Sequence, residues 1–521
     1  MNLAIVHYHL NRGGVARVIE SQLRALDAAA PAGEFRRVAI FYGGRREGFN
    51  AKLPEQLRSI RLVFEELPDL DYDAVRLIRS ASCGGLADSL AAALSRLDFS
   101  PATTIVHVHN HSVGKNVELP TALTSLAEQG YRLLLQIHDF AEDWRPDNFR
   151  RFFQPEADES FPGLSHGAIY PQAPHIHYAV LNNRDLGILR EAGVAAGRTH
   201  FLPNPALGDD GQPPQAEARR RLAAEFGVEP DQRFVLYPVR CIRRKNVGEA
   251  LLYSRLAPAG TVVGLTLPPL NPAETPFYVA WKAAAAELNL PCRFEVGAPG
   301  ALTFPECLAA ADLMLSTSVA EGFGMVFLEA WLTGNALIGR DLPEITADFT
   351  RAGLRLDLLR SQLLVPLDWV GRDAIGDAMA ELYLQTLAAY GRSAPADLAA
   401  QIREKTQAEY VDFGDLDESM QRQLLEAACE TAENRSRLLA ANPGVEQALR
   451  MGGKEAAERI RTNRMIVEDS FSLAPSGERL LAIYRRLAAT VPEADKIGPA
   501  ERPQRILDRF LDLKRFRMIR S

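Results

Sequence analysis

The chain has 521 residues, of which 47% are hydrophobic and 24% charged, and its formal net charge is −7. This length exceeds what one hydrophobic core supports, so we expect two main domains and an appendage. The negative charge argues against a nucleic-acid-binding protein, which needs a basic face. Five scattered cysteines without a CxxC pair, no signal-peptide pattern and no long apolar stretch favour a cytoplasmic enzyme with reduced thiols.

The first two hundred residues alternate short apolar runs with amphipathic stretches, which predicts a parallel sheet wrapped by helices. The runs that indicate buried strands are Asn2–Tyr8, Arg37–Tyr42, Thr103–His109, Tyr131–His138 and His175–Leu181. The stretches with helical spacing are Val15–Leu26, Ala74–Leu97 and Val117–Gln129. The segment Phe201–Pro205 is typical of a hinge, so we predict an α/β domain over residues 1–204.

A second α/β series follows, and we predict a second domain over residues 205–490. Its expected strands are Arg233–Val239, Thr261–Thr266, Arg293–Val296, Leu313–Ser316 and Ala336–Gly339. Strand ends of both domains are expected to face a cleft. Residues 374–464 are almost continuously helical in pattern and highly charged, which predicts a helical insertion, and Ile466–Leu487 is expected to complete the domain.

The segment Ser318–Ala330 carries the strongest chemical signal, because it joins an apolar strand to a helix. Gly322 and Gly324 let the backbone approach a ligand, and the helix start directs N–H groups at an anion. Glu321 and Glu329 offer carboxylates that accept pairs of hydroxyl donors, as on a hexose or a ribose. On spacing alone, a simple strand-turn-helix with solvated acids is the alternative.

Two further loops fit an anionic ligand. Arg240–Lys245 has four basic residues in six directly after a strand, where fixed cations stabilise a departing phosphate, although such a cluster alone is more often a solvated turn. Gly13 and Gly14 lie between the first strand and its helix and permit close approach to a diphosphate. The loop is not GxGxxG, and by itself it is a weak signal.

Together these segments resemble the donor site of the retaining glycosyltransferases of family 4, which have the GT-B fold of two Rossmann-like domains. The resemblance spans the chain to Gly339 and again Ile466–Leu487. It implies that Glu321 contacts the transferred sugar and Glu329 the nucleotide ribose. It also implies that the backbone from Gly322 to Met325, including Phe323 and Gly324, faces sugar and phosphate. Arg240, Lys245 and Gly14, with Gly13 beside it, would then hold the diphosphate.

The sequence departs from the family pattern on both sides of the basic cluster. Val239 and Asn246 occupy positions where glycines are common, so Arg243 and Arg244 remain possible substitutes for the expected cations.

Histidines supply the expected acceptor side. All ten lie before residue 201. His138-Asp139 ends a predicted strand and is similar to the acceptor-face histidine of family 4, although a lone strand-end histidine is more often structural. His107, His109 and His111 alternate and allow a zinc site, but no nearby cysteine or acid completes one, so we expect His109 to line the cleft.

Two remaining features each have a structural and a functional interpretation. Asp69–Asp73 contains DxD, the metal–diphosphate motif of the other main glycosyltransferase fold, but helix capping explains it better. Residues 491–521 are predicted to end in a basic amphipathic helix, with seven basic and two acidic residues in Arg502–Ser521. Such a helix can lie on an anionic membrane, but packing back on the domains is favoured.

The sequence therefore predicts a hexosyltransferase that uses a nucleotide diphosphate sugar and an unidentified hydroxyl acceptor. The resemblance implies retention of configuration and no required metal or cofactor. His138 would position the reacting sugar rather than act as a nucleophile. Specificity is expected in loops around Gly297–Phe304 for the base and His138–Arg150 for the acceptor. The alternatives are a nucleotide-sugar epimerase of the same fold and a non-catalytic protein whose insertion binds a partner.

Overall fold

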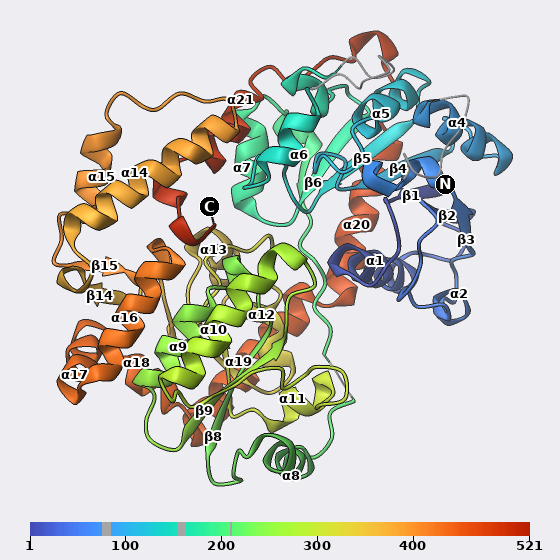
Figure 1. Cartoon of the computed structure of the whole chain (residues 1–521). Helices are drawn as coiled ribbons and strands as arrows, with labels where there is room; N and C mark the ends of the chain where they lie inside the picture. Colours follow the sequence, from blue (N-terminus) through green and yellow to red (C-terminus); the bar gives the residue numbers. More distant parts are fainter. Residues whose placement is uncertain (76–84, 154–162, 209–210, 521) are drawn as a thin grey trace. The chain divides into compact units, whose positions relative to one another are not determined.

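The computed structural model describes residues 1–75, 85–153, 163–208 and 211–520 (Figure 1). It divides into two compact units. Unit 1 contains Met1–Pro205 and Asp469–Asp512, and unit 2 contains Ala206–Glu468 and Leu513–Ser521. Each unit has its own parallel sheet flanked by helices, as the alternating sequence pattern predicts.

Unit 1 is built on a seven-stranded parallel sheet with the order β3-β2-β1-β4-β5-β6-β7. The strands are β1 Asn2–Val6, β2 Arg37–Tyr42, β3 Leu62–Glu66, β4 Thr104–His109, β5 Arg132–Ile137, β6 Ile176–Val180 and β7 Thr199–Phe201. All five predicted strands are present. Their side chains are nearly all buried, which explains their continuous apolar composition. The two edge strands, β3 and β7, carry no such run and were not predicted.

The described helices of unit 1 include two that come from the C-terminal part of the chain. They are α1 Gly14–Ala29, α2 Leu53–Gln56, α4 Leu86–Arg96, α5 Leu119–Glu128, α6 Pro146–Arg151, α7 Asn183–Glu191, α20 Leu473–Ala488 and α21 Gln504–Phe510. The helices predicted at Val15–Leu26 and Val117–Gln129 are confirmed. The helix predicted at Ala74–Leu97 corresponds to α4 in its second half, and its residues 76–84 lie outside the described part of the chain.

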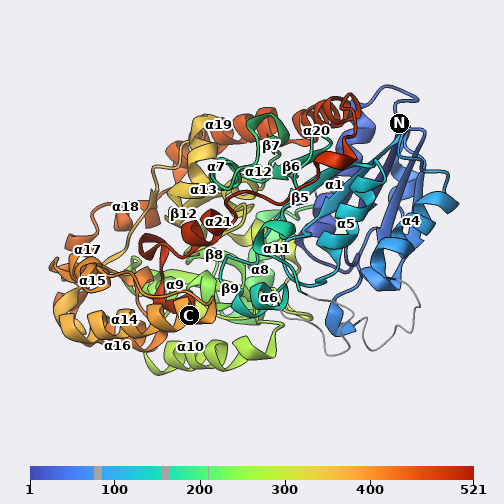
Figure 2. The same cartoon turned by 90° about the horizontal axis from the view of Figure 1, so that it is seen from above.

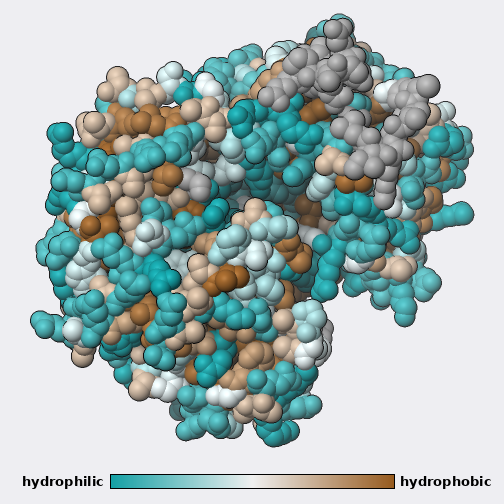
Figure 3. Space-filling view, viewed as in Figure 1, coloured by the Kyte–Doolittle hydropathy of each residue, from teal (hydrophilic) through white to brown (hydrophobic). Residues whose placement is uncertain are grey.

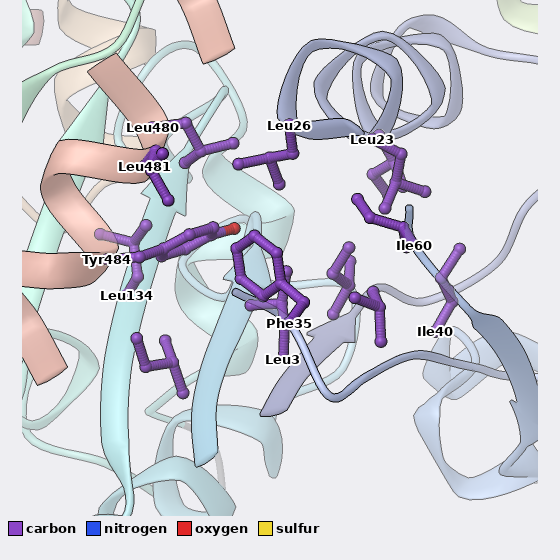
Figure 4. Close-up of a cluster of buried hydrophobic side chains, with 14 of the residues drawn as sticks. Leu3, Leu23, Leu26, Phe35, Ile40, Ile60, Leu134, Leu480, Leu481 and Tyr484 are labelled. Atoms are coloured by element: carbon purple, nitrogen blue, oxygen red, sulfur yellow. The ribbon is translucent and has the colours of Figure 1, made fainter. Parts of the chain in front are cut away.

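Helix α20 packs along α1 and joins the core of unit 1 (Figure 4). Leu480, Leu481 and Tyr484 lie against Leu23 and Leu26 of α1, above side chains from the sheet. Full burial of a large apolar side chain stabilises by roughly 1.5–3 kcal/mol. Residues 469–490, which we placed in the second domain from the sequence, therefore group with unit 1.

Unit 2 has a six-stranded parallel sheet with the order β10-β9-β8-β11-β12-β13. The strands are β8 Arg233–Arg240, β9 Thr261–Leu267, β10 Cys292–Arg293, β11 Leu313–Ser316, β12 Ala336–Arg340 and β13 Leu359–Arg360. The predicted strands are present, although β10 ends before most of the predicted Arg293–Val296. Around the sheet lie α8 Gln215–Phe226, α9 Val247–Leu256, α10 Thr275–Glu287, α11 Phe304–Ala310, α12 Val326–Leu332 and α13 Pro343–Arg351.

The region predicted as a helical insertion is mostly helical and contains one short strand, which pairs with a strand that precedes the region. Its helices are α14 Arg372–Ala389, α15 Leu398–Thr406, α16 Glu418–Glu430, α17 Ala432–Ala441, α18 Val445–Leu449 and α19 Gly453–Phe471. Strands β14 Leu364–Pro366 and β15 Tyr410–Asp412 pair antiparallel beside them. Helices α16 and α17 pack on α9, and they lie beside it in both ribbon views (Figure 1 and Figure 2). The insertion is thus attached to the sheet layer of unit 2.

The basic C-terminal segment buries its apolar side chains within the protein. Ile506, Leu507 and Phe510 of α21 are buried in unit 1, where Phe510 lies 5.1 Å from Phe140 between ring centres. Phe516 is buried in unit 2 against Tyr383, at 5.2 Å. The helix is also shorter than the whole of Arg502–Ser521. These contacts favour packing on the protein over an apolar face open to a membrane.

The surface seen in Figure 3 is mainly hydrophilic, with hydrophobic residues scattered over it. The exposed large apolar side chains include Leu270, Met465 and Val491. Among the residues described, none of the helices combines the length and the apolar composition that crossing a bilayer requires.

Candidate functional site

The predicted donor residues of unit 2 meet where the order of its sheet reverses. The chain runs from β8 outward to β9 and β10, then returns to place β11 on the other side of β8. Loops that follow two such neighbouring strands diverge and leave a crevice at their carboxyl ends, where ligands bind in open α/β sheets. The loop after β8 carries Lys245, and the loop after β11 carries Glu321. The topology therefore brings together two residues 76 positions apart.

Glu321 is held by two cations of the basic cluster. Its Oε1 accepts a hydrogen bond from Lys245 Nζ, and its Oε2 accepts one of 2.8 Å from Arg244 Nη1. The Glu321 side chain is only 9% exposed. Burial alone would raise its pKa, but Lys245 and Arg244 outweigh this effect and lower the pKa of Glu321 to about 2. Glu321 is therefore ionised near neutral pH and acts as a hydrogen-bond acceptor.

Two hydroxyl groups hold the backbone of Lys245 in place. Tyr237 Oη donates to the Lys245 carbonyl at 2.8 Å, and Thr317 Oγ1 donates to the same oxygen at 3.1 Å. Burial lowers the pKa of the Lys245 ammonium, while Glu321 opposes that shift. Two loops from neighbouring strands are thus locked together, and the cation is positioned before any ligand arrives.

The glycine-rich part of the Glu321 loop has a strict steric requirement at Gly324. Its φ of +83° lies in the left-handed region, and a Cβ there would come within 2.6 Å of Phe327 Cδ2. Phe323 is buried and packs edge-on against Phe349 at 5.4 Å, so its side chain belongs to the core. The Phe323 side chain is therefore not available to a ligand, and the ligand-facing role of the backbone at Phe323 and Gly324 stays a prediction. Helix α12 then begins at Val326, and Glu329 lies in its first turn.

The basic cluster divides differently from the prediction. Arg244 joins Lys245 at Glu321, whereas Arg240 donates from Nη1 to the Pro268 carbonyl at 3.0 Å. Within the described part of the chain, Arg240 makes no hydrogen bond to Glu321. Arg243 turns away and pairs with Glu418 at 2.7 Å. The proposed phosphate role of Arg240 stays a prediction, and Arg244 is an additional candidate.

Asn246 ends the cationic turn in a left-handed conformation, with φ 51° and ψ 58°. Asparagine tolerates this region better than most residues, so it can replace the glycine common at this position. Its side chain is fully buried: Nδ2 donates to Glu249 at 2.6 Å, and Oδ1 accepts from Gln421 Nε2 at 2.9 Å. Because Gln421 belongs to α16, the insertion holds the turn that presents Lys245.

A buried ion network lies behind the same turn. Arg340 of β12 donates to both Glu249 of α9 and Asp412 of β15, and all three side chains are at most 2% exposed. Asp412 accepts a bidentate pair of bonds, each 2.8 Å long. The network connects the sheet, the helix after Asn246 and the insertion. Breaking one member would leave the remaining charges unpaired in a dry interior.

In unit 1 the strand order also reverses, between β1 and β4. Gly13 and Gly14 follow β1 and open α1, and both are exposed. Gly13 has an extended backbone, and a Cβ at Gly14 would meet nothing within 4 Å. The fold itself therefore does not require glycine at Gly14, which is consistent with space kept for a ligand.

His109 and His138 end neighbouring strands and contact each other. His109 Nδ1 and His138 Nε2 are 2.9 Å apart, and the rings are stacked at 5.2 Å. Burial lowers the pKa of His138 to about 4 although Asp139 opposes the shift, so the ring is neutral near pH 7. Asp139 itself pairs with Arg145 at 2.6 Å. The predicted acceptor-side residues are therefore grouped at one edge of the sheet.

Asn110 organises this group and was not found from the sequence. It adopts a left-handed φ of 63° at the end of β4. Its Oδ1 accepts bonds from the backbone N–H groups of His138 and Asp139 at 2.7 and 2.9 Å. The sequence did contain a signal for this residue: an asparagine directly after one buried strand, at the end of the sheet where a second strand also ends.

The other sequence features have structural explanations. His107 bonds Tyr484 Oη at 2.7 Å, and His111 bonds the Ile169 carbonyl at 3.1 Å, so the alternating histidines turn to different partners. Asp71 and Asp73 of the DxD segment pair with Arg45 and Arg151. These ion pairs occupy carboxylates that a metal–diphosphate motif would need. The helix that follows lies mostly outside the described residues, so the helix capping stays a prediction.

Comparison with known proteins supports the fold and gives one distant relative. No protein-family model matches the chain. Mannosylglucosyl-3-phosphoglycerate synthase of Petrotoga mobilis is 27% identical over 360 residues. The aligned part covers 67% of this chain, and the chain spans 66% of that relative's length.

Solved structures resemble the whole chain at low sequence identity. A glycosyltransferase from Rickettsia africae has a TM-score of 0.53 at 12% identity, and sucrose-phosphate synthase from Thermosynechococcus elongatus has 0.51 at 15%; each match covers 94% of this chain and 99% of the other. HepE of Anabaena, in complex with UDP and glucose, has 0.50 at 13%, covering 93% and 99%. The architecture of two parallel-sheet units is that of the GT-B fold, as predicted.

Proposed function

We propose that this protein is a glycosyltransferase that moves a hexose from a nucleotide diphosphate sugar to an acceptor hydroxyl. The observation that carries the proposal is the ionised, nearly buried Glu321 held by Lys245 and Arg244 where the unit 2 sheet reverses. A carboxylate and two cations at this place can bind sugar hydroxyls and phosphate oxygens together. The GT-B fold and the distant synthase of glycosylated phosphoglycerate support the same function.

The cations would act mainly on the leaving group. Negative charge grows on the nucleotide diphosphate as the sugar–phosphate bond breaks, and fixed positive groups stabilise that charge without reorganising. Lys245 supplies a point charge, and Arg244 can donate a bidentate pair of hydrogen bonds to phosphate. Arg240 would join them, as its place in the family pattern implies. When phosphate binds, it would share these cations with Glu321.

Glu321 would orient the transferred hexose by accepting hydroxyl hydrogen bonds. Its low pKa excludes a role as a general acid near neutral pH, because the carboxylate carries no proton there. Backbone groups of Gly322 to Met325 would lie beside the sugar and phosphate, and Glu329 would accept bonds from the ribose. The left-handed φ of Gly324 fixes the path of that backbone.

Unit 1 would contribute the acceptor side. Gly13 and Gly14 would allow the diphosphate to approach the start of α1, a helix of 16 residues without a side-chain cap. His138 would position the reacting sugar as a neutral ring, supported by His109, and Asp139 would border the acceptor. The acceptor hydroxyl would lose its proton to the departing phosphate.

Retention of anomeric configuration and independence of metal are part of the proposal. Both follow from the resemblance to family 4, and the cationic pair at Glu321 supports the second, since it provides positive charge at the leaving group. The product's configuration can be read by proton NMR. Activity in the presence of a chelator would test the metal.

The most informative experiment is a screen of UDP, GDP and ADP sugars with the full chain, first by thermal shift and then by product formation. A donor that binds the folded state raises the melting temperature. Acceptors should include glycosides of 3-phosphoglycerate, since the relative's name designates such a product. Each donor should also be incubated without acceptor, because an epimerase would convert it there and a transferase would not.

Variants connect the activity to the site. Replacing Glu321 with Gln should lower kcat by about 100-fold or more, in the range seen when one preorganised transition-state contact is lost. Glu446→Gln is the matched control, because the half-buried Glu446 side chain forms an ion pair with Arg450, four residues further on. Near-normal turnover by both Glu321→Gln and Lys245→Ala would refute the assignment.

A further inference from the structure

A cavity of about 580 Å³ lies within unit 1, away from the residues described above. Its lining includes Gln172, Pro174, His177, Arg198, Arg486 and Lys496. These residues come from the start of β6, from the segments before β6 and β7, from the end of α20 and from the loop that follows it. All belong to unit 1, so the cavity does not depend on how the two units are arranged.

The cavity lies at the edge of the sheet opposite the predicted acceptor side. Every strand of unit 1 is parallel to its neighbours, so amino ends share one edge and carboxyl ends the other. Gly13, His109 and His138 follow carboxyl ends. His177 is the second residue of β6, and Arg198 directly precedes β7. A ligand in this cavity would therefore not compete for the acceptor-side residues.

The cavity has an excess of positive charge. Arg198 and Arg486 form no ion pair with a carboxylate among the residues that the structure describes. Lys496 is neutralised by Glu493 beside it in the same turn. Burial lowers the pKa of His177 to about 4, and His200, Arg486 and Arg198 lower it further, so the histidine adds no charge near neutral pH. Two uncompensated guanidinium groups remain.

The walls hold these groups in place. Arg198 Nη1 donates to the Ala173 carbonyl at 2.6 Å, which orients the guanidinium. His177 lines the cavity, and its Nδ1 lies 2.9 Å from His200 Nε2, which holds the ring in place. The loop after α20 is tied back by the paired backbone bonds between Gln172 and Gly498, at 2.7 and 3.0 Å. The cavity is thus formed by regular elements and by a fixed loop.

We propose that this cavity is a second anion site, which binds the phosphate group of a small phosphomonoester between Arg198 and Arg486. A phosphomonoester carries a charge of about −1.5 to −2 near pH 7, which matches two guanidinium groups better than a single carboxylate does. Guanidinium groups also fit phosphate oxygens with pairs of parallel hydrogen bonds. The cavity volume leaves room for the organic part of the molecule beside the phosphate. Because its lining residues belong to unit 1, the cavity is a different site from the predicted donor residues of unit 2.

Calorimetric titration of the full chain tests this proposal. The ligands are glycerol phosphate, inorganic phosphate and glycerate, at constant ionic strength because screening would otherwise change all three. We expect saturable binding of both phosphates and at least tenfold weaker binding of glycerate. Equal binding of glycerate, or no saturable binding of either phosphate, would overturn the proposal.

Variants locate the binding. Arg486→Gln should weaken binding of glycerol phosphate at least tenfold. Arg485→Gln is the matched control, since Arg485 is the adjacent residue on α20 but pairs with Glu34 outside the cavity, and it should bind within twofold of the wild type. Lys245→Ala should also retain binding. Loss of binding in Lys245→Ala, or equal losses in both arginine variants, would place the anion elsewhere.

Hydrogen exchange of the unaltered protein gives an independent readout that does not depend on folding of a variant. Glycerol phosphate should slow amide exchange in residues 196–198 and 490–498, and should leave residues 240–246 unchanged. Protection confined to residues 240–246 would mean that the phosphate binds at the donor loop and would refute a second site.

Discussion

Mild acidification should unfold unit 1 selectively, because this unit holds every histidine of the chain. Several of them are buried with strongly lowered pKa values, including four with values of about 3 for His7, His107 and His111 and about 4 for His138, in each case chiefly through burial. Unfolding returns each ring to water and to a pKa near 6.5. Between these values the unfolded state binds more protons, so stability falls as the pH is lowered.

The size of the effect follows from the shifts. Lowering the pH from 7.5 to 5.0 protonates the unfolded ring almost completely and the folded ring hardly at all, which costs about 2 kcal/mol per histidine. Four independent rings would cost about 8 kcal/mol. Because His7, His107 and His138 interact with one another, we expect a total of about 4 to 8 kcal/mol. A domain has only about 5–15 kcal/mol to lose.

Unit 2 serves as an internal control. It contains no histidine. Its buried Glu249 has a pKa raised by burial to about 7, although Arg340 opposes the shift. A raised carboxyl pKa means that the folded state takes up the proton first, so this group favours folding as the pH falls from 7 to 5. Unit 2 should therefore keep its stability in this range.

Hydrogen exchange read by mass spectrometry, with rates corrected for pH, resolves the two units. Peptides from β4 and β5 should lose most of their protection at pH 5.0, while peptides from β8 and β11 keep theirs. A His107→Gln variant should weaken the pH dependence of unit 1 by about 2 kcal/mol, because one titrating group is gone. Equal protection of β4 and β5 at both pH values would refute the reasoning.

Substitutions at three positions test the architecture around the donor loop. Gly324→Ala should destabilise unit 2 by about 2–4 kcal/mol in urea unfolding, because a left-handed φ costs an alanine about 1–2 kcal/mol and its Cβ meets Phe327. Arg340→Met should cost about 3–5 kcal/mol in the same measurement, since it leaves Glu249 and Asp412 buried without their cation. Asn246→Gly should retain more stability and more donor affinity than Asn246→Ala, because glycine keeps the left-handed turn; the opposite order in thermal melts and titrations would contradict the role of φ.

Most of the fold could be predicted because its strands are covered on both faces. Such strands are rich in Val, Ile and Leu, as in Arg132–Ile137, and they stand out from the surrounding pattern. Edge strands lack this signal: Leu62–Glu66 is only partly buried and ends in two acids. The grouping of Leu473–Ala488 with unit 1 was also hidden, because an amphipathic helix shows which face is apolar but not which core receives it.

The candidate site was predictable to the extent that its residues belong to recognisable loop motifs. Glu321 and Lys245 were found this way, and the sheet order explains why they meet. The choice between Arg240 and Arg244 was not predictable, because the bulge near the end of β8 and the turn after it decide which guanidinium reaches Glu321. The side chain of Asn110 is placed by a left-handed backbone, and a backbone angle gives only a weak signal in the sequence.

Asn246 shows how a departure from the family pattern is accommodated by the insertion. A glycine at this position would supply the left-handed turn without partners, and an asparagine brings two polar groups into a fully buried place. Glu249 and Gln421 satisfy both groups, and Gln421 can do so because α16 approaches α9 at Gly248, where a Cβ would lie 2.6 Å from the Gln421 side chain. Without α16, the amide oxygen of Asn246 would lose its donor. Asn246 and the insertion therefore act together to fix the turn that presents Lys245 to Glu321.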